Sequence, residues 1–338
     1  MLVAGDIGGT KTDLAIYSVE SGPRVPLTEI EVRSSDYPSL QAMVAAFLAQ
    51  VKMRVDVASF SVPGPVIEGH VTATNLPWVM DEVSLARDLN LKAVHLMNDL
   101  EAVARSVPVL QPADLVTLNQ GESVAKGPIA VIAPGTGLGE SFLTWDGAGY
   151  TAHASEGGHS DFAPTDAQQI RLLQFLLQRF EHVGVERVCS GSGVPNIYEY
   201  FRDEEKIAER PDVAQAIASA KDPTRAIVAA ALDPDRPSEL CRTTLEMLVS
   251  ILASESGNLF LKLFATGGIY VAGGIAVRAV ALLQQPRFMQ AFVNKGRFRG
   301  LMGRVPVKVI TTRAPLVGAA AYGLQSLTGE RLMKNFTA

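Results

Sequence analysis

Asn98 and Asp99 stand side by side directly after the apolar run Ala93–Met97. A short run of this kind predicts a strand, and open α/β sheets bind their ligands at the carboxyl ends of their strands. An aspartate at such a place can accept a hydroxyl proton, and an asparagine can hold a neighbouring hydroxyl. The alternative interpretation is that the pair caps a helix beginning at Leu100.

The segment from Gly5 to Thr10 contains two adjacent glycines and lies between two predicted strands. It is one residue short of a Walker A loop, because Thr10 stands where that pattern has glycine, and a Walker A loop would open a helix. A glycine hairpin can still direct backbone N–H groups toward an anion, and Asp6 can hold a magnesium-bound water. An ordinary structural hairpin is the alternative.

The segment Gly135-Thr136-Gly137-Leu138-Gly139 is a second glycine-rich turn. It resembles a dinucleotide-binding fingerprint, but Glu140 occupies the place of the last glycine and no helix pattern follows. We interpret it as a second turn that faces phosphate groups. A purely structural turn is the alternative.

Glu156-Gly157-Gly158-His159 has the Glu-x-x-His spacing of carboxylate metal sites, which lie on helices. Two central glycines disfavour a helix, so the spacing does not favour a metal site here. We expect a tight turn that presents a carboxylate and an imidazole to a ligand with several hydroxyl groups. Glu186, taken alone, is typical of a solvated helix or loop residue.

Hydrophobic periodicity predicts an α/β chain in which strand, glycine turn and strand occur twice. The repetition indicates two related halves. One long amphipathic helix is expected to bury a stripe made of Ile170, Leu173, Leu177 and Phe180. Further helices are expected at 40–51, 100–107, 243–263 and 316–327, and strands at 2–4, 12–17, 55–62, 93–97, 129–133, 141–145, 267–274 and 307–311.

Composition limits the classes of function. A length of 338 residues suggests two domains, and 47% hydrophobic residues are enough for a large core. The net charge of −5 and the lack of a basic run argue against nucleic-acid binding. Two cysteines cannot form a disulfide framework or a four-cysteine zinc site. No segment is typical of a signal peptide or a membrane span, so we expect a cytoplasmic protein.

The motifs also occur in a definite order along the chain. That order and spacing resemble those of the bacterial glucokinases, and the resemblance covers nearly the whole chain. The broader repressor–kinase family carries a cysteine-rich zinc motif after its Glu-x-x-His segment, which this chain lacks. The matching segments are Asp6 to Thr10, Asn98 to Ala102, Gly135 to Gly139, Glu156 to His159, Glu186 to Gly191, Ala272 to Ile275 and Lys295 to Phe298.

The resemblance implies an actin-like, ribonuclease-H-like α/β fold with two domains around a central cleft. Residues 1–109 and 310–338 would form the small domain, and residues 110–309 the large one. The implied reaction transfers the γ-phosphoryl group of ATP to D-glucose with Mg²⁺, in a protein that is typically a homodimer. Asp99 would be the general base, and Asp6 would hold the metal. The sugar would be bound by Asn98, Asp99, Glu156, His159 and Glu186. The nucleotide would be bound by Gly5, Asp6, Ile7, Gly8, Gly9, Thr10, Gly135, Thr136, Gly137, Gly273 and Gly274.

Three other functions remain open at this point. The same fold could phosphorylate mannose, fructose or an N-acetylhexosamine. It could also serve a sugar-sensing regulator, but such a protein needs a DNA-binding segment, and the first phosphate turn already begins at residue 5. A nucleotide-binding module without catalysis is the third, and Asp99 argues against it.

Overall fold

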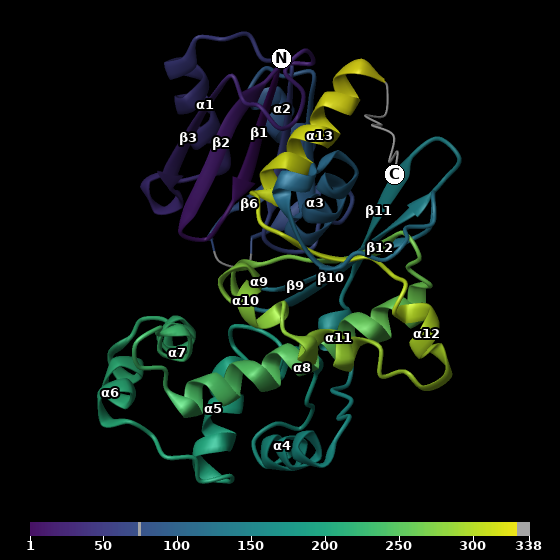
Figure 1. Cartoon of the computed structure of the whole chain (residues 1–338). Coiled ribbons are helices and arrows are strands. Elements are labelled where there is room, and N and C mark those ends of the chain that lie inside the picture. The colour runs from purple at the N-terminus through teal and green to yellow at the C-terminus, as the bar shows by residue number, and fades with distance from the viewer. Residues whose placement is uncertain (74–75, 330–338) are drawn as a thin grey trace. The chain divides into compact units, whose positions relative to one another are not determined.

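The computed structural model describes residues 1–73 and 76–329 (Figure 1). It contains two compact units. The first comprises Met1–Asp114, Ser141–Ala154 and the chain from Thr312, and the second comprises Leu115–Glu140 and Ser155–Thr311. Ser141–Ala154 therefore groups with the first unit, although it lies within the range 110–309 predicted for the large domain. Residues 330–338 of the expected small domain lie outside the described residues.

The first unit is built on a five-stranded sheet with the order β3-β2-β1-β4-β7. β1 is antiparallel to β2 and parallel to β4, and β4 is parallel to β7. The carboxyl ends of β1, β4 and β7 therefore meet at one edge. The strands are β1 (Leu2–Ile7), β2 (Lys11–Tyr17), β3 (Thr28–Arg33), β4 (Val57–Val62) and β7 (Ala93–Asn98), and a separate pair is formed by β5 (His70–Thr72) and β6 (Val79–Asp81).

Helices cover both faces of this sheet, because alternate strand residues point to opposite sides. Val3 and Ile7 of β1 belong to the same buried cluster as α1, whereas Leu2 and Ala4 belong to the cluster of α13. The helices are α1 (Leu40–Val51), α2 (Glu82–Asp88), α3 (Asp99–Ser106) and α13 (Ala314–Thr328). The strands and helices expected in this part of the sequence are confirmed.

Gly318 allows α13 to approach α3 closely, because a Cβ atom at this position would overlap the carbonyl oxygen of Ala102. We expect Gly318→Ala to lower the free energy of unfolding by about 1–3 kcal/mol, since the added methyl group forces the helices apart. Urea unfolding followed by circular dichroism measures the effect. Gly300→Ala is the control, because a Cβ there meets nothing within 4 Å. Equal losses in the two variants would contradict this explanation.

A second sheet has six strands in the order β11-β10-β9-β12-β13-β8. β12 lies between β9 and β13 and is parallel to both, and β8 is antiparallel to β13. The carboxyl ends of β9 and β12 therefore also meet at one edge. The strands are β8 (Leu115–Asn119), β9 (Ile129–Pro134), β10 (Leu138–Trp145), β11 (Tyr150–Ser155), β12 (Gly268–Val271) and β13 (Val307–Ile310).

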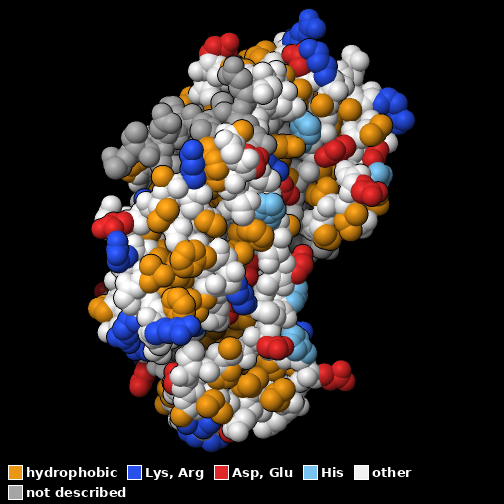
Figure 2. All heavy atoms as spheres, turned by 90° about the vertical axis from the view of Figure 1, so that its right-hand side faces the viewer, with side chains coloured by type: hydrophobic (Ala, Val, Ile, Leu, Met, Phe, Trp, Pro, Cys, Tyr) orange, Lys and Arg blue, Asp and Glu red, His pale blue; other side chains and the backbone are white. Residues whose placement is uncertain are grey.

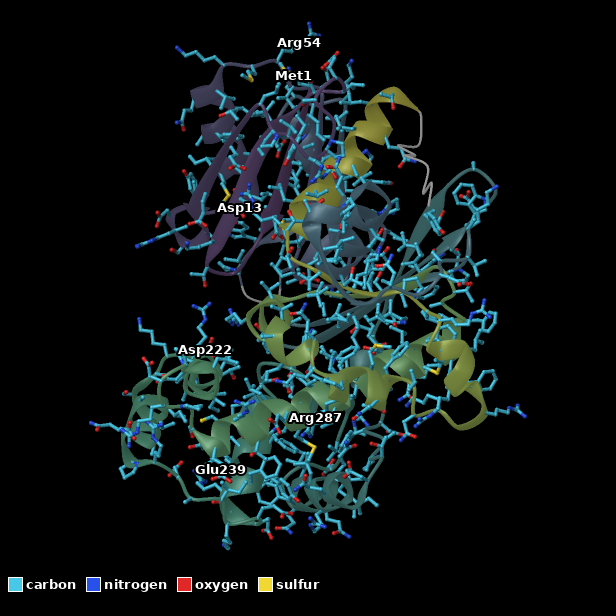
Figure 3. The ribbon with its side chains drawn as sticks, viewed as in Figure 1. Met1, Asp13, Arg54, Asp222, Glu239 and Arg287 are labelled. Carbon is cyan, nitrogen blue, oxygen red and sulfur yellow. The ribbon has the colours of Figure 1, made fainter. Side chains whose placement is uncertain are left out.

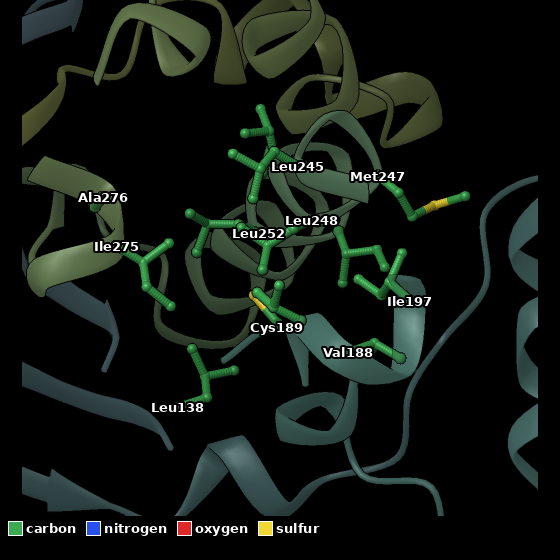
Figure 4. Packing of buried hydrophobic residues seen from close by; sticks show 14 of the residues in the cluster. Leu138, Val188, Cys189, Ile197, Leu245, Met247, Leu248, Leu252, Ile275 and Ala276 are labelled. Carbon is green, nitrogen blue, oxygen red and sulfur yellow. The ribbon is translucent and has the colours of Figure 1, made fainter. Parts of the chain in front are cut away.

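The core of the second unit surrounds α8 (Glu239–Leu263), a helix of 25 residues. Leu248 and Leu252 of α8 lie beside the buried Cys189 (Figure 4). Arg287 of α11 donates to Glu246 of α8 at 3.1 Å (Figure 3). The other helices are α4 (Ala167–Leu177), α5 (Val194–Asp203), α6 (Pro211–Ser219), α7 (Pro223–Leu232), α9 (Gly274–Arg278), α10 (Val280–Leu283), α11 (Pro286–Phe292) and α12 (Arg299–Met302).

α4 forms where the sequence predicted a helix, but only half of the predicted stripe packs: Leu173 and Phe180 are partly buried against the core, whereas the other two residues are exposed. Ile170 and Leu177 are 49% and 52% exposed, and Phe180 follows the end of the helix. Apolar residues recur at helical spacing on two adjacent rows, so periodicity alone could not select the row that packs. The core contacts select the neighbouring row, which is Gln169, Leu172, Phe175 and Leu176.

The surface carries both signs of charge. On the face shown in Figure 2, Lys and Arg side chains lie among Asp and Glu side chains. This mixture agrees with the net charge of −5 and gives no extended basic surface on that face. Within residues 1–73 and 76–329, no helix combines the length and the apolar character needed to cross a membrane.

Candidate active site

Asp6 and the Asn98–Asp99 pair lie at the same edge of the first sheet. Asp6 pairs in register with Ser61 of β4, and Val62 of β4 pairs with Asn98 of β7. These positions are at the carboxyl ends of neighbouring parallel strands, as the sequence predicted for the pair. The register therefore brings two acidic side chains that are far apart in the sequence to one edge of the sheet.

The Asn98–Asp99 pair begins α3, so the capping interpretation is correct. Oδ1 of Asn98 accepts a hydrogen bond from the N–H of Leu100 at 2.9 Å, and Oδ1 of Asp99 accepts from the same group at 2.8 Å. The Asn98 amide also donates to the carbonyl of Gly64 at 3.1 Å. Capping fixes the direction of both side chains, and it is compatible with a base because a carboxylate has two oxygen atoms.

Asp6 lies in an environment that opposes its ionisation. Burial raises the pKa of Asp6, the hydrogen bond from Ser61 lowers it and the negative charge of Asp99 raises it, so that together they bring the pKa to about 6. The Ser61 hydroxyl donates to Asp6 Oδ1 at 2.9 Å. Electrostatic repulsion between Asp6 and Asp99 favours a cation nearby. The sequence did not identify Ser61, since nothing near it in the chain marks the contact.

The residues present fit a magnesium ion that arrives with phosphate groups. Mg²⁺ is commonly bound by one or two carboxylates together with substrate phosphates and waters. Asp6, with Asp99 as its neighbour, meets that requirement. Among the described residues no group of three or more His, Cys, Asp or Glu side chains could hold a metal ion. An all-protein metal cage is therefore not built in this part of the chain.

The first glycine turn is shorter than the sequence predicted. Gly5, Asp6 and Ile7 belong to β1, and the Ile7 side chain is buried in the core. The turn itself consists of Gly8, Gly9 and Thr10, which lie between β1 and β2.

The N–H of Gly8 donates to the carbonyl of Lys11 at 3.0 Å and closes this turn. Ser34 stabilises the turn, since its hydroxyl donates to the Gly8 carbonyl at 2.6 Å and lies 3.0 Å from Thr12 Oγ1. Ser34 is a second contributor that sequence reasoning missed.

The second glycine turn connects β9 to β10. The N–H of Gly135 donates to the carbonyl of Gly137 at 2.8 Å, and Gly191 donates to the Gly135 carbonyl at 2.7 Å. Gly273 follows β12 with φ of +90°, and a Cβ there would overlap the carbonyl of Pro134. The two predicted nucleotide segments, Gly135–Gly137 and Gly273–Gly274, therefore lie next to each other at one sheet edge.

Glu186 contacts the second glycine turn directly. It lies in a 3₁₀ turn, η5 (Val185–Arg187), and its Oε2 atom accepts a hydrogen bond from the N–H of Leu138 at 2.9 Å. A Cβ at Gly137 would overlap the same carboxylate. Glu186 is therefore an ordered, half-buried residue, and the interpretation as an ordinary solvated residue is wrong.

Glu156 precedes another 3₁₀ turn, η4 (Gly157–His159), and His159 is its last residue, which agrees with the expected tight turn. Both side chains are exposed, and His159 Nε2 lies 3.9 Å from Glu156 Oε2. η4 and η5 are joined by a hydrogen bond of 2.8 Å from the N–H of Val185 to the carbonyl of Ser160. The segments of Glu156, His159 and Glu186 are thus adjacent, as a shared sugar site requires.

The chain is similar to known proteins over nearly its whole length. The glucokinase family model matches residues 3–326. A glucokinase from Trichormus variabilis is 39% identical over 337 residues, which cover 95% of this chain and 98% of the relative. The crystal structure of a glucokinase from an Antarctic psychrotroph has a TM-score of 0.82 and 30% identity, over 95% of this chain and 98% of that one.

A more distant structure matches the fold alone. It is a ROK family glucokinase from Streptomyces griseus in complex with glucose and AMPPNP, with a TM-score of 0.63 and 18% identity, over 96% of this chain and 99% of that one. The expected actin-like, ribonuclease-H-like α/β fold is confirmed. Since the family model spans nearly all of the sequence and curated relatives are 32–39% identical at high coverage, this chain belongs to the glucokinase family.

Proposed function

We propose that this chain transfers the γ-phosphoryl group of ATP to the 6-hydroxyl of D-glucose, giving glucose 6-phosphate and ADP, with Asp99 as the general base. The observation that carries the proposal is the position of Asn98 and Asp99 at the same sheet edge as Asp6, at the carboxyl ends of parallel strands. The curated relatives named glucokinase, which are 32–39% identical over nearly the full chain, support this reaction.

Each proposed sugar ligand would have its own role. Asp99 accepts the proton of the 6-hydroxyl as that oxygen attacks phosphorus, and Asn98 holds a neighbouring hydroxyl. Glu156, His159 and Glu186 bind the hydroxyls on the C1–C2 side of the ring. Carboxylates accept hydrogen bonds from hydroxyls, and an imidazole can donate one, so this set suits a neutral polyol.

The nucleotide would be held mainly by backbone N–H groups. Gly8 to Thr10 and Gly135 to Gly137 would face the phosphates, and Gly273 with Gly274 the nucleoside. Asp6 would hold Mg²⁺ through its carboxylate or a bound water, with Ser61 orienting that carboxylate. Magnesium, when bound, neutralises charge that develops on the phosphoryl oxygens, where positioning and electrostatics dominate catalysis.

We also propose a cytoplasmic homodimer with residues 1–109 and 310–338 as the small domain and 110–309 as the large one. The family resemblance supports this organisation. Closure on glucose would exclude water and suppress ATP hydrolysis.

A coupled assay of ADP release across a panel of hexoses tests the proposed reaction. The panel contains glucose, mannose, fructose and N-acetylhexosamines, with ATP or polyphosphate as the phosphoryl donor. We expect the highest kcat/KM for glucose with ATP. A higher value for another hexose would replace the glucose assignment, and no ADP release with any sugar would indicate a sugar-sensing or nucleotide-binding protein without catalysis.

Metal removal should separate activity from folding. We expect a chelator to abolish phosphoryl transfer while leaving the melting temperature unchanged, because the proposed magnesium arrives with ATP and is not part of the folded core. Adding Mg²⁺ back should restore activity. Elemental analysis should find no stoichiometric zinc. A fall in melting temperature on chelation, or one tightly bound zinc per chain, would contradict the proposed roles of Asp6, Glu156 and His159.

A further inference from the structure

Two buried carboxylates in the second unit have no role in the proposed reaction. Glu140 of β10 is 2% exposed and Glu255 of α8 is 4% exposed. Within residues 1–73 and 76–329, three buried side-chain oxygens have no hydrogen-bond partner, and two of them are Glu140 Oε1 and Glu255 Oε1. A buried, unpaired carboxylate is costly, and such a group usually retains a proton.

Glu255 has compensating contacts on its other side. Its Oε2 accepts a hydrogen bond from Asn258 at 2.8 Å, and Lys262 Nζ lies 3.6 Å from its Oε1. Lys295 Nζ donates to Asn258 Oδ1 at 2.7 Å and to Ser254 Oγ at 3.0 Å. This lysine belongs to the Lys295–Phe298 motif and extends the polar network. Lys262 and Lys295 therefore both place positive charge near Glu255.

Glu140 lacks comparable support. Burial and the negative charge of Glu255 raise the pKa of Glu140 and Lys262 lowers it, so that together they bring the pKa to about 7. Cys189 also faces the pair, and burial followed by the charges of Glu255 and Glu140 raises the pKa of its thiol. The buried carboxyl of Glu140 therefore holds its proton to a higher pH than an ordinary carboxyl does.

The Glu140 carboxylate lies against the turn that carries two proposed sugar ligands. A Cβ at Gly157 would overlap Glu140 Oε2, and a Cβ at Gly158 would overlap the carbonyl oxygen of Leu138. The first residues of β10 thus form the surface on which η4 rests. The same segment binds Glu186 through the N–H of Leu138. Displacement of Glu140 would therefore shift the turn that carries Glu156 and His159.

We propose that Glu140 is a positioning residue for glucose: its buried, neutral carboxyl packs against Gly157 and supports the Glu156–His159 turn in the geometry that binds the sugar. Ionised Glu140 would place a second negative charge beside Glu255 and move toward water, away from Gly157. This inference rests on the proposed sugar-binding role of the turn.

The protonation state of Glu140 determines how the affinity for glucose changes with pH. Glucose binds best while Glu140 is protonated, so affinity is highest below the raised pKa and falls as the pH rises through it. The Michaelis constant for glucose should then increase by about threefold to tenfold between about pH 6 and about pH 8, because a difference of one pKa unit between two states corresponds to tenfold in affinity. The value of kcat, which depends on Asp99, should not follow this change.

The experiment measures KM and kcat for glucose against pH, at saturating ATP and magnesium, for the wild type, E140Q and E122Q. Glutamine keeps the shape and the donor of the neutral form, so E140Q should lose the rise in KM and retain the low value found at acid pH. Glu122 is exposed and pairs with Arg304, so E122Q should keep the wild-type profile. In E255Q the neighbouring charge is absent, so the rise in KM should begin at lower pH.

Three results would overturn the inference. They are a KM profile of E140Q that is identical to that of the wild type, a wild-type KM that does not rise with pH, and failure of E140Q to fold, since neutral Glu140 is the proposed native form. If the wild type does not phosphorylate glucose at any pH, the proposed function fails instead. The two failures are distinguishable, because the first leaves glucose phosphorylation by the wild type intact and the second abolishes it.

Discussion

Asp99→Asn should lower kcat by about 10²–10⁴-fold while glucose still binds, because the variant loses the proton acceptor for the 6-hydroxyl. Among the expected effects this is the largest. The measurement is steady-state ADP release, combined with calorimetric titration of glucose. A kcat above about a tenth of the wild-type value would mean that Asp99 only caps α3.

The contacts of Asp99 indicate that this substitution removes the base without disturbing the start of α3. Asp99 Oδ1 accepts the N–H of Leu100, and Asn98 Oδ1 accepts the same group. An asparagine at position 99 retains an oxygen acceptor, so the start of α3 is preserved and the loss in kcat reports the missing base. The melting temperature should remain close to that of the wild type.

Asp81→Asn is the matched control for Asp99→Asn. Asp81 is the N-cap of α2 in the same unit, and its Oδ1 accepts the N–H of Ser84 at 2.7 Å. The two variants change the same chemical group at the start of a helix, but only Asp99 lies at the proposed site. We expect Asp81→Asn to leave kcat unchanged. A similar fall in both variants would assign the effect to folding.

Glu186→Ala should reduce kcat/KM for glucose by about one to two powers of ten for the lost hydroxyl contact, since a hydrogen bond to a charged group contributes about 1.5–3 kcal/mol. A further reduction should follow from the second contact of this carboxylate. Its Oε2 holds the N–H of Leu138 in the glycine turn proposed to face ATP. Loss of that anchor should raise KM for ATP as well.

An analogue separates the two contributions of Glu186. The sugar 1,5-anhydroglucitol lacks the C1 hydroxyl, so Glu186→Ala should cost it only the part due to the Leu138 anchor. Glucose should lose both parts. Glu186→Gln keeps an acceptor for Leu138 and should leave KM for ATP near the wild-type value. Equal losses for glucose and the analogue would show that Glu186 supports the turn without touching the sugar.

Local sequence was sufficient to predict the elements that carry the site. The apolar run before Asn98 predicts β7, and the polar pair that ends it marks the carboxyl end of a strand. The two glycine turns are recognisable because glycines clustered between two β-favouring runs are typical of a tight turn. These predictions succeeded because strand periodicity and turn chemistry depend on residues close together in the chain.

The buried face of α4 could not be predicted from the local sequence. Two neighbouring rows of this helix have helical apolar spacing, and Ile170 on the predicted row is exposed whereas Leu172 on the other is buried. The choice between the rows depends on which surface meets the core of the second unit. That surface is assembled from residues far away in the sequence, so no local pattern can specify it.

The contacts that tune the site depend on tertiary structure in the same way. Ser61 reaches Asp6 across 55 positions, Ser34 reaches Gly8 across 26, and Glu186 reaches Leu138 across 48. Each is a hydrogen bond between a side chain and a partner that the sheet register or a turn brings within reach. The sequence alone determined which residue types stand at strand ends and turns. Only the tertiary structure decided their partners, because hydrogen bonds and charges act over a few ångströms of space, whatever the distance along the chain.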